Sequence, residues 1–345
     1  ALNRFIQGKM RDTRSILSAK LNIKPSQIKK LHDAGYKFLE DLKEASPLTL
    51  SKGVSVQEAL SIIRQIKNDK LPSASLTSIV RRETYTIPTF CDGIDKLLGG
   101  KGVALGKIIE FCGIPGIGKT QMGIQLSINV QIPRSLSGPE GEAVYIDTEG
   151  SFIIQRVAEI ANGTTTRLNE TVEGSPFNLE TILSRIYYFR IHDYIQLNAL
   201  IKNMDEFLNE HQAVKLIVID SIAFHFRTEL ELSVRTRVLQ MVAQKLEDIA
   251  ESFEIAIVLM NQMTTKFGGN SGPDNTTLAP ALGDVLSEAC SDRVLLFCRE
   301  EERFAHLFKS ATKPELQATS VQYQIIKDGI RDCPLPTRKR RLDEE

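Results

Sequence analysis

The sequence has few cysteines and no long apolar run, and each absence excludes a class of protein. The five cysteines of the 345-residue chain show no C-x-x-C spacing, and the five histidines do not cluster with them. This pattern argues against a disulfide framework and a zinc site, and it indicates a reducing compartment. Cys112 and Cys298 lie in strand-like runs, and we expect both to be buried. No apolar run reaches the roughly 18 residues of a membrane span, so we predict no membrane partner.

An excess of charge of one sign is also lacking. Lysine plus arginine (43) balances aspartate plus glutamate (43), so no global basic field marks the chain as a nucleic-acid-binding protein. A DNA partner would have to be bound by local basic patches. The proportions of hydrophobic (42%) and charged (25%) residues are ordinary for a globular protein, and the length allows a large domain with a small one.

Both ends of the chain differ from its middle. Residues 1–67 are predicted to form a small helical domain of helix-hairpin-helix type, which would present backbone N–H groups to DNA phosphates or serve as a protein-docking bundle. The polar stretch 68–84 is predicted to be a linker. The tail, 331–345, carries the cluster "RKRR" at 338–341, which is either a nuclear-import signal or a solvated tail. We therefore expect a nuclear protein, with or without a cytoplasmic pool.

From residue 85 to residue 330, apolar strand-like runs alternate with helical stretches. The runs lack polar alternation, which is typical of a parallel sheet that helices cover on both faces. "FAHLFKS" and "SVQYQII" are expected to add antiparallel edge strands. The predicted fold class is therefore α/β, a mostly parallel sheet flanked by helices. The strand candidates are residues 107–112, 142–147, 185–189, 215–220, 255–260 and 293–298.

The stretch "GIPGIGKTQ" follows the first of these strands and opens a helical stretch. Its residues 113–120 satisfy the pattern G-x-x-x-x-G-K-[ST]. The glycines let the loop turn its N–H groups around phosphate oxygens, Lys119 supplies a charge to the β- and γ-phosphates, and Thr120 offers a hydroxyl to Mg²⁺. The sequence therefore predicts ATP and Mg²⁺ as ligands. The residues expected to hold ATP are Gly113, Ile114, Pro115, Gly116, Ile117, Gly118, Lys119, Thr120 and Gln121.

Carboxylates follow two other strands. Asp220 ends "KLIVID", and a carboxylate beside such a loop holds Mg²⁺ through water. Asp147 and Glu149 end the strand of "YIDTEG". One of these two would be the general base that orients a water molecule, and strand alternation does not decide between them. Either one would alternatively cap the helix that follows.

An amide pair ends a further strand. Asn261 and Gln262 stand in "VLMNQMTTK", ahead of the Gly-rich stretch "KFGGNSGPDNTTLAPALG". A neutral amide at this edge can sense the γ-phosphate and report it to the loop behind, and long loops in compact domains are often functional. The alternative is an amide with a purely structural role.

At these motifs the chain resembles the RecA-like recombinase family. "GIPGIGKTQ", "AVYIDTEGSF", "KLIVIDSIAFHFR" and "VLMNQMTT" occur in that family's order and spacing, over about residues 85–330. The N-terminal helical domain is similar to that of the eukaryotic and archaeal members. The segments "VQIP", "IYYFRIHDY", "IAFHFR" and "NQMTTK" and the basic tail resemble one branch, the C-type paralogs of the eukaryotic recombinase.

The resemblance implies roles for several residues. It implies that Glu149 is the general base and that Gln262 is the sensor between the nucleotide and a DNA-binding loop. It also implies that Arg156 stacks on adenine and that Pro314 belongs to the segment by which a neighbouring subunit caps ATP. The first DNA-facing loop would be "FHFRTELELSVRTR", and the second would span residues 263–285.

Three departures from the family pattern put self-assembly in doubt. Strand-exchange recombinases carry a Phe-x-x-Ala tether in the linker, whereas residues 54–89 contain no phenylalanine. The second loop has the acidic Asp284 and Glu288 where recombinases have paired glycines, and carboxylates weaken contact with phosphates. Lys309 stands where active recombinases have an acid near the neighbour's γ-phosphate, and we expect it to act there in trans as a finger-type charge or simply to be exposed.

Together these features predict an ATP-binding DNA-repair protein of homologous recombination. We expect a DNA-dependent ATPase with weak turnover, acting in a heteromeric complex with other recombinase paralogs. Its further partners would be single-stranded and branched DNA and the main strand-exchange recombinase. Two alternatives are an ATP-gated scaffold with negligible hydrolysis and an autonomous strand-exchange recombinase.

Overall fold

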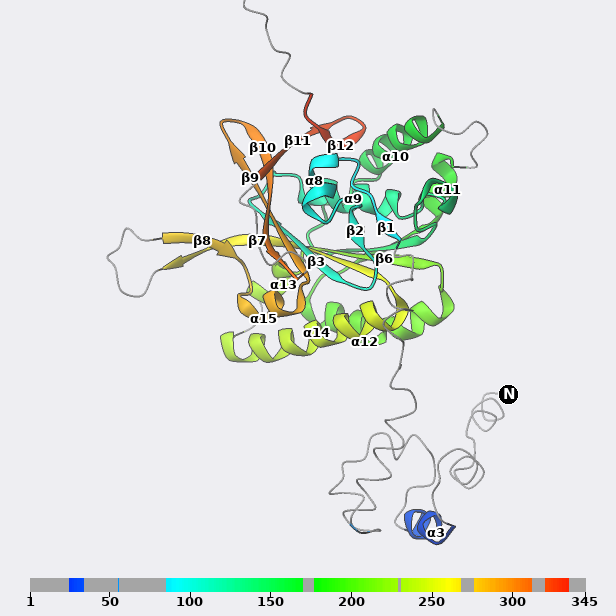
Figure 1. Ribbon diagram of the computed structural model, residues 1–345. Coiled ribbons are helices and arrows are strands. Elements are labelled where there is room, and N and C mark those ends of the chain that lie inside the picture. The colour runs from blue at the N-terminus through cyan, green and yellow to red at the C-terminus, as the bar shows by residue number, and fades with distance from the viewer. Residues whose placement is uncertain are drawn as a thin grey trace, which may run out of the picture. The chain divides into compact units, whose positions relative to one another are not determined.

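The computed structural model describes residues 25–33, 55, 85–169, 177–228, 231–267, 276–311 and 320–334 (Figure 1). The chain divides into two units, Ala1–Glu83 and Thr84–Glu345. In the first unit, α3 (Pro25–Asp33) begins with a proline, a residue that suits the first position of a helix. Most of the expected N-terminal domain, the linker 68–84 and the basic cluster 338–341 lie outside the described residues.

The second unit is built on a ten-stranded sheet, whose strands lie in the order β12-β11-β10-β9-β3-β7-β6-β4-β5, with β8 paired to β7. From β9 to β5 all neighbours along this order are parallel, whereas β10, β11 and β12 add an antiparallel meander at one edge. The predicted α/β fold and its antiparallel edge are confirmed. The strands of this sheet are β3 (Ile108–Gly113), β4 (Glu142–Asp147), β5 (Ile186–Arg190), β6 (Val214–Asp220), β7 (Ala256–Phe267), β8 (Thr276–Pro280), β9 (Asp292–Arg299), β10 (Glu302–Ser310), β11 (Ser320–Ile326) and β12 (Gly329–Asp332).

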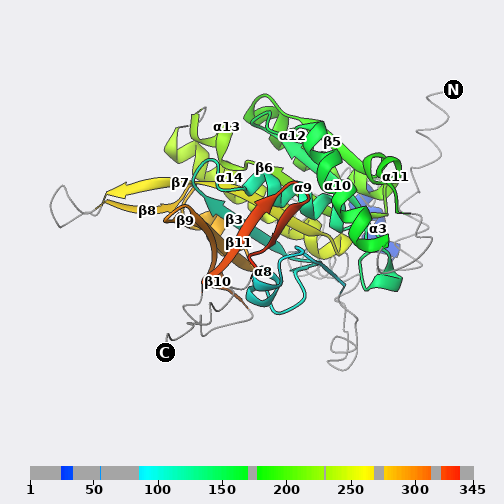
Figure 2. The same ribbon diagram turned by 90° about the horizontal axis from the view of Figure 1, so that it is seen from above.

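Helices cover both faces of this sheet, which explains why its central strands are mainly apolar. Every residue of β3 is buried. Figures 1 and 2 show α9 and α10 on one face and α12 and α14 on the other. Two separate apolar cores result, one on each face. The helices of this unit are α8 (Asp92–Leu97), α9 (Lys119–Asn129), α10 (Ile154–Asn169), α11 (Leu179–Ser184), α12 (Tyr194–Glu210), α13 (Ala223–Thr228), α14 (Leu232–Phe253) and α15 (Asp284–Ala289), with a short 3-10 helix, η1 (Arg134–Leu136). A small separate ribbon pairs β1 (Thr86–Ile87) with β2 (Val103–Ala104).

Three local expectations differ from the structure. The stretch expected as the first DNA-facing loop is largely helical, since α13 and the start of α14 occupy it. The described part of the expected second loop is a hairpin of β7 and β8 followed by α15, and the hairpin projects from the sheet (Figures 1 and 2). Cys112 is buried as expected, but Cys298 is exposed because it lies at the outer end of β9, next to the turn into β10. Within the described ranges, no helix has both the length and the apolar character to cross a bilayer.

Candidate nucleotide site

The loop between β3 and α9 is shaped to surround an anion. Gly116 and Gly118 adopt φ angles of 78° and 115°, in the left-handed region that favours glycine. Gly118 is the N-cap of α9, and among the described residues no side chain caps this helix. The first N–H groups of α9 are therefore left to bind an anion such as a phosphate.

Neighbouring strands leave no room for a side chain at two of the glycines, Gly113 and Gly118. A Cβ atom on Gly118 would come within 2.5 Å of Ile325 Cδ1, and one on Gly113 within 2.6 Å of the carbonyl oxygen of Leu296. Tyr323 adds a brace, because its hydroxyl donates to the carbonyl of Ile117 over 2.8 Å. Strands β9 and β11 thus fix the shape of the loop from outside.

Lys119 lies folded into the loop. Its Nζ donates to the carbonyl oxygens of Gly113 (2.9 Å) and Ile114 (3.0 Å). Burial lowers the pKa of Lys119, while the charges of Asp220 and Glu149 act in the opposite direction. Phosphate oxygens would offer this ammonium group stronger acceptors than the two carbonyls do.

Thr120 and Asp220 form the part of the site that fits Mg²⁺. Thr120 Oγ1 donates to Asp220 Oδ2 over 2.7 Å, and the hydroxyl of Tyr145 donates to the same oxygen over 2.8 Å. Burial raises the pKa of Asp220, and the two hydrogen bonds lower it. A hydroxyl beside one carboxylate suits Mg²⁺, which is usually held by few protein ligands together with substrate phosphates and water. Among the described residues, no group of three or more His, Cys, Asp or Glu side chains could hold a metal ion. A Mg²⁺ site of this kind does not require such a group, because phosphates and water supply the other ligands.

The carboxylate of Asp147 is committed to local structure. It is fully buried, and its Oδ1 accepts the backbone N–H groups of Glu149, Gly150 and Ser151 at 3.1, 2.7 and 3.2 Å. Oδ2 accepts the N–H of Phe152 and the hydroxyl of Tyr188. Asp147 therefore shapes the turn after β4, and its oxygens are already occupied.

Glu149 lies within that turn, and its side chain faces the loop. Its Oε1 accepts hydrogen bonds from Ser221 Oγ (2.5 Å) and from Gln262 Nε2 (2.7 Å). Gln262 Oε1 accepts from Arg227 Nη1 at 3.1 Å. The side chain of Gln262 thus connects the carboxylate of Glu149 with α13, at the start of the expected first DNA-facing loop.

Arg156 is held beside the loop by the turn between β11 and β12. Its Nε donates to Gln121 Oε1 (2.6 Å), and its Nη atoms donate to the carbonyls of Ile326 and Lys327 (2.7 and 2.6 Å). The guanidinium group is therefore fixed next to Gln121, near the start of α9.

Pro314 and Lys309 were both expected at the boundary with a neighbouring subunit, and the structure describes only Lys309. Pro314 lies outside the described residues. The Nζ of Lys309 donates to carbonyls of its own chain, those of Ser287, Glu288 and Cys290, at the C-terminal end of α15. A lysine at this place satisfies terminal carbonyls and complements the helix dipole.

The sequence interpretation missed three residues of the site. Ser221 and Arg227 contact residues far away in the chain, so no local pattern marks them. Tyr145 carries a weak signal, because it precedes Asp147 by two residues and therefore lies on the same face of β4.

Comparison with known proteins identifies the family of the chain. A family model described as Rad51 matches residues 80–333. "DNA repair protein RAD51 homolog 3" of Cricetulus griseus is 38% identical over 342 residues, which cover 90% of each chain. The protein of the same name from Dictyostelium discoideum is 40% identical over 275 residues, which cover 77% of this chain and 71% of the relative. The family model matches most of the chain, and the sheet and its loop have the geometry described above. The chain therefore belongs to the Rad51 family, with a RecA-like core and recombinase paralogs among its relatives.

Proposed function

We propose that this chain binds ATP and Mg²⁺ at the loop of residues 113–121 and hydrolyses ATP slowly under the control of DNA. The chain would act in DNA repair by homologous recombination, as one subunit of a heteromeric complex of recombinase paralogs. The observation that carries this proposal is the hydrogen bond between Glu149 and Gln262, beside Lys119 and the pair of Thr120 and Asp220. The names of the relatives, which specify DNA repair, support the biological setting.

Each side chain of the site would contribute one part of the hydrolysis. Glu149 would accept a proton from the attacking water, and Lys119 would bind the γ-phosphate as negative charge develops. Thr120 and Asp220 would hold Mg²⁺, which when bound neutralises charge on the phosphates. Arg156 would support the adenine with its guanidinium plane.

The same contacts explain why turnover would be weak without DNA. Glu149 Oε1 already accepts two hydrogen bonds, so both lone pairs of this oxygen are occupied and a water molecule must displace a donor to bind there. Arg227 holds the other end of the Gln262 amide. If DNA binds Arg227, the Gln262 amide loses its second partner and can turn away from Glu149, which frees a lone pair of the carboxylate for the attacking water.

DNA would be bound by local cations rather than by a global field. Arg227 on α13 and Arg237 on α14 are exposed, and Phe224, which is also on α13, is 40% exposed. An arginine contacts phosphates, and an exposed aromatic ring can stack on an unpaired base. These features favour single-stranded or branched DNA over a regular duplex.

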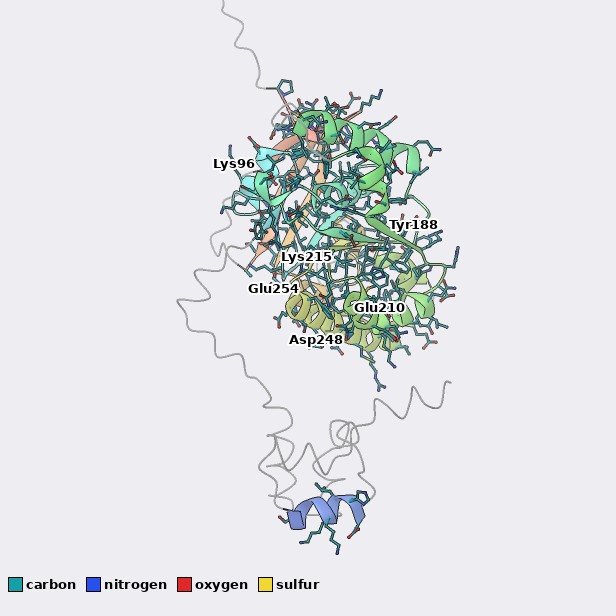
Figure 3. The ribbon with its side chains drawn as sticks, turned by 90° about the vertical axis from the view of Figure 1, so that its right-hand side faces the viewer. Lys96, Tyr188, Glu210, Lys215, Asp248 and Glu254 are labelled. Carbon is teal, nitrogen blue, oxygen red and sulfur yellow. The ribbon has the colours of Figure 1, made fainter. Side chains whose placement is uncertain are left out.

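The edge strand β5 offers a surface for another paralog. β5 ends the sheet order, and Tyr188 on this strand is 44% exposed (Figure 3). An apolar pocket of about 250 Å³ lies beside it, lined by Phe152, Ile154, Val157, Leu183, Ile186 and Tyr188. An extended segment can add to such an edge and place an apolar side chain in the pocket. Because residues 54–89 of this chain contain no phenylalanine, the segment would come from a different paralog, which favours a heteromer over a self-assembled filament.

The proposal is tested by ATP turnover of the full chain, with and without single-stranded DNA, and by electron microscopy of the same samples. Slow turnover that DNA stimulates, with no filaments of this chain alone, is expected. ATP binding without measurable turnover would favour the scaffold alternative. Long regular filaments that pair DNA strands would favour an autonomous recombinase.

A further inference from the structure

The side chain of Ser221 is one of the two donors that hold the carboxylate of Glu149. Ser221 directly follows Asp220, the last residue of β6, and it is 0% exposed. Its Oγ donates to Glu149 Oε1 over 2.5 Å. A serine hydroxyl is a short group, so the direction in which it donates depends on the backbone that carries it. The next question is therefore what fixes the backbone of Ser221.

Thr148 fixes that backbone from the neighbouring strand. It directly follows Asp147, the last residue of β4, and it is 1% exposed. Its Oγ1 donates to the carbonyl oxygen of Ser221 and accepts the backbone N–H of Ser221, both over 2.8 Å. The backbone N–H of Thr148 donates to the carbonyl of Asp220, also over 2.8 Å. Three hydrogen bonds thus join the ends of β4 and β6.

The hydroxyl of Thr148 has no substitute of the same shape among apolar side chains. A hydroxyl is both a donor and an acceptor, which lets one atom satisfy the two polar backbone groups of a single residue. A valine would fill the same space but would leave the N–H and the carbonyl of Ser221 buried without these partners. Among the described residues, the Thr148 side chain bonds only to Ser221, so any effect on the site passes through that residue.

The place of these bonds connects them with the proposed chemistry. Thr148 precedes the proposed base, Glu149, and Ser221 follows the carboxylate proposed to hold Mg²⁺, Asp220. In the reaction, the water oxygen would bond to the γ-phosphorus, the bond to ADP would break, and Glu149 would take the proton. Once Gln262 turns away, Ser221 is the donor that keeps the carboxylate in its direction.

We propose that Thr148 is a positioning residue for ATP hydrolysis: its hydroxyl fixes Ser221, and Ser221 directs the carboxylate of Glu149 toward the attacking water. This inference rests on the proposed ATPase activity. It assigns a role to a buried side chain that itself contacts neither the nucleotide loop nor the carboxylate of Glu149.

The first test compares Thr148→Val and Thr148→Ser in single-turnover hydrolysis by the full chain, with saturating ATP and Mg²⁺ and with single-stranded DNA. Thr148→Val should lower the rate by about 10- to 100-fold, because misplacement of a reacting group by about 1 Å costs on the order of 10²-fold. ATP affinity, measured by a nucleotide titration, should stay within about threefold, since the loop is unchanged. Thr148→Ser keeps the hydroxyl and should restore most of the rate.

The matched control is Thr89→Val. Thr89 is 0% exposed, and its Oγ1 accepts the N–H of Cys91 and donates to the carbonyl of Cys91, both over 3.2 Å, as well as to Asp95 Oδ1. The substitution therefore removes the same kind of hydroxyl bridge, next to α8 rather than between β4 and β6. Thr89→Val should hydrolyse ATP like the parent even if its melting temperature falls as much as that of Thr148→Val.

Two further measurements distinguish positioning from a general loss of stability. In a Glu149→Gln protein, adding Thr148→Val should change the rate by less than about threefold, because the positioned base is already gone and residues that act as a unit are not additive. In the protein without nucleotide, hydrogen exchange of peptides that cover residues 218–226 should accelerate in Thr148→Val and not in Thr89→Val, because the amide of Ser221 loses its acceptor.

The outcomes separate this inference from the proposed function. A Thr148→Val protein that hydrolyses ATP like the parent overturns the inference, and so does an equal loss of rate in Thr89→Val or in the Glu149→Gln background. A parent that binds ATP without hydrolysing it overturns the proposed ATPase activity, and this inference with it, before any substitution is compared. If Thr148→Val does not fold, Ser221→Ala replaces it, because it removes only Oγ; the same loss of rate is expected, and a parent-like rate overturns the inference.

Discussion

Replacing Glu149 by glutamine should slow ATP hydrolysis without weakening ATP binding. The amide oxygen of a glutamine can still accept the hydrogen bonds that Ser221 and Gln262 now donate at 2.5 and 2.7 Å, so the local structure should persist. What is lost is the ability to take a proton from water. Loss of a general base typically costs about 10²–10⁴-fold in rate, or about 2.7–5.4 kcal/mol in the barrier.

The structure narrows this range. Glu149 already accepts two hydrogen bonds through one oxygen, so that oxygen has no lone pair left for a water molecule until one donor leaves. We therefore expect a loss near the lower limit, about 10²-fold. The measurement is single-turnover hydrolysis at saturating ATP and Mg²⁺ with single-stranded DNA, combined with a nucleotide-binding titration on the same protein.

Asp147 provides the comparison that makes this experiment decisive. Its carboxylate accepts four backbone N–H groups in the turn that follows β4. Asp147→Asn should therefore lower the free energy of unfolding by about 1–3 kcal/mol, which thermal unfolding would detect. A Glu149→Gln protein that hydrolyses ATP like the parent would refute the assignment of the base, and Asp147 would become the candidate.

Four further predictions concern other parts of the chain. Lys119→Ala should abolish tight ATP binding in a nucleotide titration, since the triphosphate loses its main charge partner. Arg293→Met should lower the free energy of unfolding in urea by about 3–5 kcal/mol, because Glu110 would remain buried without its cation, and adding Glu110→Gln should recover much of this loss. Deleting residues 338–341 should move the tagged protein from nucleus to cytoplasm in cells that lack its partner subunits; an unchanged nuclear signal contradicts the import hypothesis. If Lys309 acts in trans, Lys309→Ala should lower the ATPase rate of the reconstituted complex. An unchanged rate would mean that Lys309 only caps the C-terminal end of α15.

The parallel sheet could be predicted because its signal is local. Strands such as β3 and β6 are buried on both faces, so continuous apolar runs mark them in the sequence. The nucleotide loop could be predicted for the same reason, since Gly113, Gly118, Lys119 and Thr120 lie within eight consecutive positions. The antiparallel edge strands expected at 304–310 and 320–326 correspond to β10 and β11.

The choice between Asp147 and Glu149 could not be made from the sequence. Asp147 is the last residue of β4, and Glu149 lies beyond it, where the two-residue period of a strand no longer applies. The turn that separates their roles is made by Asp147 itself. The hairpin of β7 and β8 was missed because glycine, proline and asparagine dominate the intervening sequence and favour a loop.

The brace that β11 provides to the nucleotide loop affects how inherited variants of such a protein should be classified. Tyr323 and Ile325 follow the loop by about 200 residues in the sequence. The Tyr323 hydroxyl nevertheless donates a hydrogen bond to Ile117, and the Ile325 side chain fills the space beside Gly118. A missense change at either position would look remote from any nucleotide motif and would still act on the loop. A premature stop shortly before β11 would leave every motif of the site in place while removing the brace, so an intact motif is not sufficient evidence of an intact site.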